Sequence, residues 1–554
     1  MRERAVFLEN PGDLLYNIRD HPDRLEGTFM KTKIATVALA ALILLAALFS
    51  QSVFCASEGC SSYDDALSVA QGIIKWKKQS TGVSPEEALF SADYSGLAGS
   101  SAGDWYAFGI GRLGIDDDYE MYLAALRENV SERYAKDGGL DKIKATEWHR
   151  ITLAVLALGG DPTSFGRDSE GKPINLIADG VYNRDNLGAQ GINGLIWGLI
   201  ALDGSNYSVP AGSNYTRDGI ISELLSLRCP DGGFAFSGER SDPDMTAMAI
   251  TALAPYYGSE KTYEYELASG EKRAESVRAA VDGALGRLSE MQLETGDFRS
   301  YGLRNSGSVC QAIVALCSLG INPFEDVRFI KVGKTLWDGL MTYKNQDGGF
   351  AASLSEDGEM PSGSMAGEQA LYAMAAFMRL KRGEGRLFDF SSERGRIPVF
   401  TERDIEISER VTSEIKTENL ADVLRLLYIL DFCPDFEGKA EHTERLTATK
   451  AELMRIKAEV EDINFAIKNL SDKAGKKAVD EIIRRYKALS DYDKTKIENY
   501  DDVLCAYARI KTSERATFIA VGGVFAALII SAVLVARAKK RKRLRLPEDE
   551  TEDD

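Results

Sequence analysis

Six short segments rich in alanine and leucine recur through the first four hundred residues, and this repeat constrains the fold more than any other feature of the sequence. Between them lie more polar stretches, such as GIISELLSLR and ESVRAAVDGALGRLSEMQ, with apolar residues at helical spacing. Apolar helices that alternate with amphipathic ones predict an inner and an outer helical layer. The six segments are DWYAFGIGRLG from Asp104, HRITLAVLALG from His149, NGLIWGLIALD from Asn193, DMTAMAITALA from Asp244, CQAIVALCSLG from Cys310 and MAGEQALYAMAA from Met365.

No single pair of such helices can bury its own apolar face, so the pairs are expected to close into a double ring. Glycine-rich turns recur at CPDGGFAF from Cys229 and at NQDGGFAA from Asn345. In these turns the glycines permit a sharp reversal at positive φ, and the phenylalanine returns to the core. We therefore predict an all-α chain in which residues 57–395 form an α/α toroid with six inner and about six outer helices.

Residues 396–515 have a different character, because Glu and Lys dominate and glycine becomes rare. Apolar residues at alternating steps of three and four form a heptad seam over 453–470. Two further helices are expected over 479–489 and 497–510. We interpret this region as a short antiparallel helical stalk, with dimerisation through 453–470 as the alternative.

The segment 516–536 contains twenty-one residues without a charge, enough to cross a bilayer of roughly 30 Å as a helix. Seven lysines and arginines follow between Arg537 and Arg545, and basic flanks stay in the cytoplasm. We predict a single-pass plasma-membrane protein with an extracellular N-terminal domain. Residues 537–554 then form a cytoplasmic tail, basic at first and acidic at its end.

A second apolar run, Ile34–Phe49, follows two lysines and precedes small residues, as in a secretory signal peptide. We assign 30–56 to this signal, with an uncleaved anchor as the alternative. Residues 1–29 are then an extension or a mis-assigned start.

Composition excludes several classes of function. The net charge of −18 argues against nucleic acid as a partner and against an anionic membrane surface. The cysteines are too sparse for a disulfide scaffold, and no Cys/His spacing indicates a metal site. Cys310 and Cys317 lie two turns apart on one predicted helix and cannot bond to each other.

The DGGF turns and the SDPDMTAMA helix resemble the prenyltransferase and squalene-oxidase repeat, the toroid of terpenoid cyclases. The ordered motifs DWYA, TEWHR, QGINGLIW, SDPDMTAMA and EQALYA are similar to those of toroid proteins on the surface of Gram-positive bacteria. The same barrel occurs in the cobalamin carriers transcobalamin and intrinsic factor. The resemblance covers roughly 300 residues and implies a fold rather than an activity, because one fold hosts many functions.

The resemblance suggests catalysis at one position only. Cyclases of this class use the middle aspartate of D-x-D-D-T-A as a buried acid, and Asp244 occupies that position here. Met245 replaces the neighbouring acid that would help Asp244 to keep its proton. We expect Asp242 or Asp244 to cap the helix, with Asp244 as the general acid of a terpene-cyclase-type isomerase as the alternative.

Two other activities of this fold lack their residues. Zinc-dependent protein prenyltransfer needs Asp, Cys and His ligands, and His149 has no cysteine-containing motif nearby. An internal thioester needs C-G-E-Q, whereas this chain reads Ala366-Gly367-Glu368-Gln369.

The shared endings of the inner segments predict a ligand mouth near the helix N-termini, where helix dipoles converge. Its lining is expected to include Asp104, Trp105, His149, Asn193, Trp197, Asp244, Glu368, Gln369 and Tyr372. Packing is the alternative role for the tryptophans and for His149. The resemblance to cobalamin carriers suggests a corrinoid ligand, for which a separate partner protein would supply the lid.

The leading hypothesis is therefore a non-enzymatic, membrane-anchored surface module that binds a ligand or a partner. A structural or adhesion spacer is a further alternative.

Overall fold

The computed structural model describes residues 62–267, 269–354, 360–471 and 474–543. The predicted signal peptide, the extension before it and most of the tail lie outside these residues. The described chain is mostly helical and ends in one long apolar helix, as the sequence predicted. It divides into two compact units, one formed by Leu227–Arg386 with the described part of Met1–Ile73, the other by Ile74–Ser226 with Leu387–Asp554.

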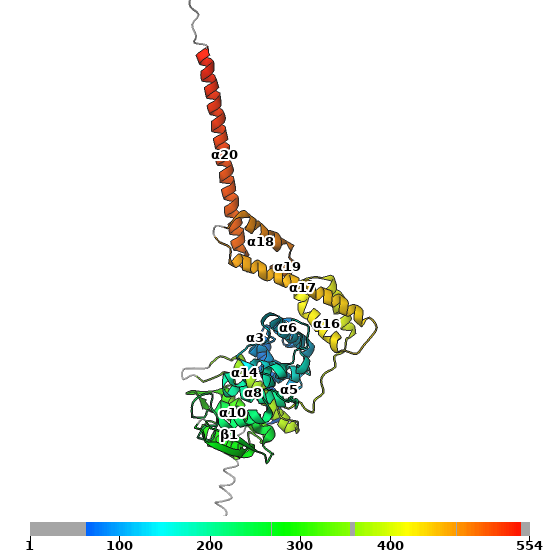
Figure 1. The fold of residues 1–554 in the computed structure, drawn as a ribbon, viewed down its shortest axis with the longest axis vertical. Coiled ribbons are helices and arrows are strands. Elements are labelled where there is room, and N and C mark those ends of the chain that lie inside the picture. Colours follow the sequence, from blue (N-terminus) through cyan, green and yellow to red (C-terminus); the bar gives the residue numbers. More distant parts are fainter. Residues whose placement is uncertain (1–61, 268, 355–359, 472–473, 544–554) are drawn as a thin grey trace, which may run out of the picture. The chain divides into compact units, whose positions relative to one another are not determined.

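Unit 1 contains three of the six predicted inner helices, α10, α12 and α14, shown in green tones in Figure 1. α12 packs against both α10 and α14. Almost every residue of α12 is buried, which is expected of a helix that is apolar on all sides. The elements of unit 1 are the start of α3 (Tyr63–Ser80), α10 (Pro243–Leu253), η4 (Ala254–Tyr256), β1 (Thr262–Glu266), β2 (Lys272–Ser276), α11 (Val277–Met291), β3 (Arg299–Ser300), β4 (Leu303–Arg304), α12 (Ser306–Ser318), η5 (Val327–Phe329), α13 (Leu336–Met341) and α14 (Ser364–Arg382).

Two antiparallel hairpins in unit 1 depart from the all-α prediction. β1 pairs with β2, and Tyr263 and Tyr265 alternate with exposed glutamates along β1, which is the pattern of a half-buried strand. β3 and β4 are joined by Tyr301 and Gly302, both at positive φ, as a tight hairpin turn requires.

The glycine-rich turns have the predicted geometry. Gly232 and Gly348 have φ of 90° and 89°. Phe234 and Phe350 are fully buried. In each turn the backbone closes a short loop, as in the 2.8 Å hydrogen bond from Cys229 N to Gly233 O.

Unit 2 contains the other three predicted inner helices, α5, α7 and α8, and α7 packs against both α5 and α8. Between α7 and α8 the chain forms three short turns instead of an outer helix, and the middle turn, η2, is a π-helix. The elements up to α9 are the end of α3, α4 (Ala92–Ser95), α5 (Ser101–Leu113), α6 (Tyr119–Asp137), α7 (Ala145–Ala157), η1 (Pro162–Ser164), η2 (Ala178–Tyr182), η3 (Leu187–Gln190), α8 (Ile192–Asp203) and α9 (Arg217–Ser226).

The predicted stalk region also belongs to unit 2, and its helices form two apolar clusters. In the first cluster α15, α16 and the start of α17 pack together, and α16 lies against α6. Arg425 of α16 binds Asp118 at 2.8 Å and Asp404 at 2.6 Å. The elements are α15 (Glu402–Ser413), η6 (Thr417–Asn419), α16 (Leu420–Phe432), α17 (Lys439–Lys468), α18 (Lys476–Ala488), α19 (Asp491–Lys494) and α20 (Tyr500–Arg543).

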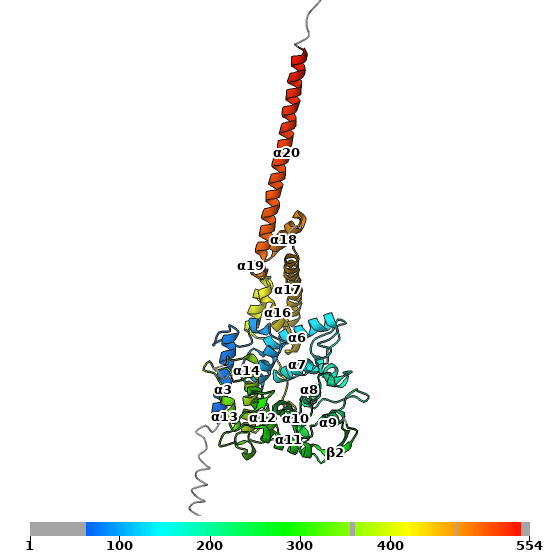
Figure 2. The same ribbon diagram turned by 90° about the vertical axis from the view of Figure 1, so that its left-hand side faces the viewer.

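The second cluster joins the end of α17 to α18 and to the start of α20, which lie side by side in Figure 2. Val460, Ile463 and Ile467 of the heptad seam are buried here, and Leu453 is buried in the first cluster. The packing within the chain therefore occupies the side chains on which the dimer alternative depended.

The third stalk helix and the apolar segment are one helix rather than two. α20 runs from Tyr500 to Arg543, because no glycine or proline interrupts the chain between 500 and 521. Its apolar side chains between Phe518 and Val535 are exposed. By length and composition α20 is suited to crossing a membrane.

Candidate functional site

The six residues that begin the repeated segments lie at different distances from the starts of their helices. Asn193, Asp244 and Met365 are the second residues after their N-caps. Asp104, His149 and Cys310 follow their N-caps by four or five residues. At about 1.5 Å per residue, each measured along its own helix, the offsets differ by up to about one helical turn. The segments end alike, but their helices begin at different points.

Asp104 lies in a buried network of unit 2. It is fully buried and accepts hydrogen bonds from Gly99 N at 2.9 Å, Tyr122 Oη at 2.6 Å and Arg150 Nε at 2.8 Å. Burial raises the pKa of the Asp104 carboxyl, against the attraction of Arg150. Three donors from the chain thus bind its two oxygens, and Asp104 fixes α5 to α7.

Trp105 and Trp197 come together, as expected of residues on one aromatic face. Their ring centroids are 5.1 Å apart, and Phe388 stands edge-on to Trp197 at 5.6 Å. Both tryptophans are partly exposed. Phe388 follows α14 and lies outside the six repeated segments, so the sequence motifs did not indicate it.

His149 is buried, with Nε2 2.8 Å from the carbonyl of Gly180. Its Nδ1 has no partner in the described chain. Burial lowers the pKa of His149 to about 4, so the ring is neutral at physiological pH. The buried Oδ1 of Asn193 also lacks a hydrogen-bond partner there.

In unit 1, Asp244 lies among neutral polar groups. Ser300 Oγ donates to Asp244 Oδ2 at 2.7 Å, because the β3–β4 hairpin brings Ser300 to the start of α10. Burial raises the pKa of Asp244, while Ser300 and Ser308 lower it. Asp242 caps α10 by accepting from Met245 N at 2.8 Å, which confirms the capping interpretation.

The predicted residues of α14 lie on the same set of packed helices. Tyr372 accepts a hydrogen bond from Gln311 Nε2 of α12 at 2.6 Å, and its pKa is raised well above the usual value by burial. Glu368 is buried. The side-chain oxygen of Gln369 occupies the space that a Cβ on Gly307 would need.

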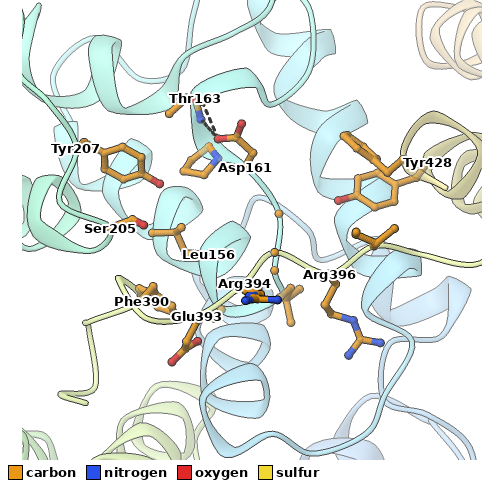
Figure 3. Close-up of a pocket in the computed structure, with 18 residues that line it drawn as sticks. Leu156, Asp161, Thr163, Ser205, Tyr207, Phe390, Glu393, Arg394, Arg396 and Tyr428 are labelled. Carbon is orange, nitrogen blue, oxygen red and sulfur yellow. Dashed lines mark hydrogen bonds between the residues drawn. The ribbon is translucent and has the colours of Figure 1, made fainter. Parts of the chain in front are cut away.

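Unit 2 has a cleft of about 560 Å³ at the C-terminal ends of α7 and α8, which we call the Tyr207 cleft (Figure 3). Tyr207, Asp161 and Tyr428 lie around it together with the segment from Phe390 to Ile397. This segment is held by Arg112, which binds Glu393 at 2.6 Å and stacks on Phe390. The cleft is at the opposite helix ends from the predicted mouth.

A second cleft of about 380 Å³ lies at the N-terminal end of α7, on the side where the mouth was predicted; we call it the Arg184 cleft. Its wall includes Trp148, Asp179 and Arg184. Trp148 Nε1 donates to Tyr134 Oη at 2.9 Å, and Tyr134 donates to Asp179 Oδ2 at 2.8 Å. The TEWHR motif of the sequence contains Trp148, whereas no motif in the sequence indicated Arg184.

Within the described residues, no group of three or more His, Cys, Asp or Glu side chains is placed to hold a metal ion. Comparisons of the chain with protein-family models, with curated proteins and with solved structures returned no match. The resemblance to toroid proteins therefore rests on the sequence motifs alone.

Proposed function

We propose that the chain is a membrane-anchored surface module that binds a small ligand or a partner outside the cell. The observation that carries this proposal is the Arg184 cleft, which lies at the N-terminal end of α7 and has the volume of a small-molecule site. α20 belongs to the same unit and supplies a helix of membrane-spanning length. The basic residues after the apolar segment support a cytoplasmic C-terminus.

The closure of the helices into a toroid is part of the proposal. Each unit contributes three helices of which the middle one packs against the other two, α5–α7–α8 and α10–α12–α14. Two sets of three packed helices are consistent with an inner ring, and helices α3, α6, α9, α11 and α13 precede or separate them along the chain, except between α7 and α8, where turns take the place of a helix.

Membrane topology tests the anchor. The protein should remain in the membrane after alkaline extraction. Protease added to intact cells should remove the N-terminal domain and leave a fragment containing 516–543. Release by alkali, or protection of the domain in intact cells together with cleavage of the tail, would contradict the proposed arrangement.

Titration with hydroxocobalamin, followed by its absorption spectrum, tests the ligand that the family resemblance suggests. Saturable one-to-one binding would make the chain a surface corrinoid receptor and direct mutagenesis to His149, Asp244 and Gln369. Absence of binding excludes the corrinoid as a ligand of this chain in the absence of the partner that would supply the lid. The Tyr207 cleft and the Arg184 cleft then remain candidate binding sites for smaller ligands.

One observation favours an enzyme as the second candidate. Burial raises the pKa of Asp244 despite the opposing hydrogen bonds from Ser300 and Ser308, so Asp244 retains a proton more readily than an exposed aspartate. A terpene-cyclase-type isomerase would use that proton on an alkene. Isoprenoid turnover that is abolished in Asp244→Asn would establish this function, and turnover unchanged in the variant would exclude Asp244 as the acid.

A further inference from the structure

The Arg184 cleft contains a buried positive charge without a carboxylate partner. Arg184 is only 9% exposed. Its Nη2 donates to the carbonyls of Asp141 at 3.2 Å and Lys142 at 2.7 Å. Its Nε is buried and makes no hydrogen bond, and no ion pair joins Arg184 to a carboxylate of the described chain. Buried arginines are usually paired, whereas Asp141 and Asp185 act on Arg184 only through space, and burial lowers the pKa of Arg184.

Trp148 holds the guanidinium in place. The Arg184 guanidinium carbon is 4.4 Å from the centroid of the Trp148 ring, a cation–π arrangement. Trp148 is itself fixed by its hydrogen bond to Tyr134, and Gly180 packs on its Cβ. Because Nη2 already donates to two carbonyls and Nε is buried, Nη1 is the guanidinium nitrogen left to donate to a ligand carboxylate.

The local backbone also distinguishes this cleft. Asp179 and Gly180 lie in the π-helix η2, a conformation that occurs often at functional sites. A Cβ on Gly180 would lie 2.6 Å from the Cβ of Trp148, so the π-helix approaches the tryptophan as closely as a glycine permits. The irregular turn thereby brings Asp179 and Arg184 to the same cleft.

The charges around the Arg184 cleft restrict the kinds of anion that could bind there. The exposed residues Asp137, Asp179 and Asp185 contribute to the wall, together with Lys142. These carboxylates would repel a multiply charged anion such as phosphate, and they favour a cationic group at the outer end of a ligand. A carboxylate directed at Arg184 and an ammonium group directed at Asp179 satisfy both features.

We infer that the Arg184 cleft binds an amino-acid-type zwitterion, with its carboxylate on Arg184 and its ammonium group on the carboxylate of Asp179. A cleft of about 380 Å³ is suited to a free amino acid or a dipeptide. This inference rests on the proposed function and adds the chemical class of the ligand.

The test uses the full chain in detergent or nanodiscs, with the standard amino acids and Ala-Ala as probes. We expect one or more of them to raise the melting temperature and to bind saturably by calorimetry at up to millimolar concentrations. For a probe that binds, the analogue without the amino group and the analogue without the carboxylate should each bind at least about tenfold more weakly, because each loses one charged contact.

Variants locate the site. Arg184→Gln and Asp179→Asn should each weaken binding about tenfold or more. Arg394→Gln, in the Tyr207 cleft, is the matched control and should bind as the wild type does. If Arg184→Gln does not fold, Asp179→Asn and the two analogues still decide the question. Equal binding of the deamino analogue, or unchanged binding in Asp179→Asn, overturns the zwitterion assignment.

The outcome is separable from the proposed function. If none of the probes binds while the protein keeps the predicted membrane topology, the ligand class is refuted and the anchored module remains. If an amino acid binds but alkali releases the protein from membranes, the anchor is refuted and the cleft assignment remains.

Discussion

The buried pair between Asp104 and Arg150 provides the sharpest test of the network that fixes α5 to α7. In Asp104→Ala, three donors lose their acceptor: Arg150 Nε, Tyr122 Oη and Gly99 N. Arg150 has a side chain that is only 12% exposed, so its charge would remain in the interior with only Glu147, at 4.0 Å, as a counter-charge. Breaking a buried ion pair in this way costs about 3–5 kcal/mol.

For a domain of this size, that loss lowers the melting temperature by roughly 6–20 °C. Four of the five tryptophans belong to unit 2, so tryptophan fluorescence during thermal unfolding reports mainly on the affected unit. Glu170→Ala is the matched control. It removes an exposed ion pair with Lys172 and should change the stability by less than about 1 kcal/mol.

The double variant Asp104→Ala/Arg150→Met separates the pair from the packing around it. Replacing both charges removes the stranded cation, so the double variant should be more stable than Asp104→Ala alone. A loss below about 1 kcal/mol in Asp104→Ala would refute the reasoning. Asp104 would then be free for the ligand role predicted from the sequence.

Three further predictions concern other parts of unit 2. Ile463→Ala should lower the free energy of unfolding, measured by chemical denaturation, by about 2–5 kcal/mol, because the side chain is fully buried in the second stalk cluster. Phe465→Ala is the control on the same helix and should leave this free energy nearly unchanged, because its side chain is 70% exposed. Gly180→Ala should cost about 1–3 kcal/mol in the same assay, because its Cβ would overlap Trp148; wild-type stability would show that η2 moves freely. His149 has a folded-state pKa of about 4, below its unfolded value, so the unfolded state binds the proton first and stability falls as the pH drops from about 6.5 to 4. Relative to His149→Gln, the wild type should lose about 2 kcal/mol between pH 7 and 4.5, and a pH-independent difference would show that His149 is not held neutral.

The sequence by itself determined the helices and the turns between them. All six alanine- and leucine-rich segments are helical, because their period and propensity act within a few residues. The DGGF turns reverse at Gly232 and Gly348 as predicted, because the positive φ is a local requirement. The same local reasoning found the cap at Asp242 and the apolar segment of α20.

The tertiary structure alone decided which side chains meet. Asp104 pairs with Arg150, 46 residues away, and the Arg184 cleft combines the end of α6, the start of α7 and the turns around η2. Neither association leaves a periodic signal, because it depends on how distant elements pack. For the same reason the heptad seam of α17 indicated an apolar face without indicating that α16, α18 and α20 would cover it within the chain. Local patterns specify which faces are apolar, and long-range packing specifies the neighbour each face acquires.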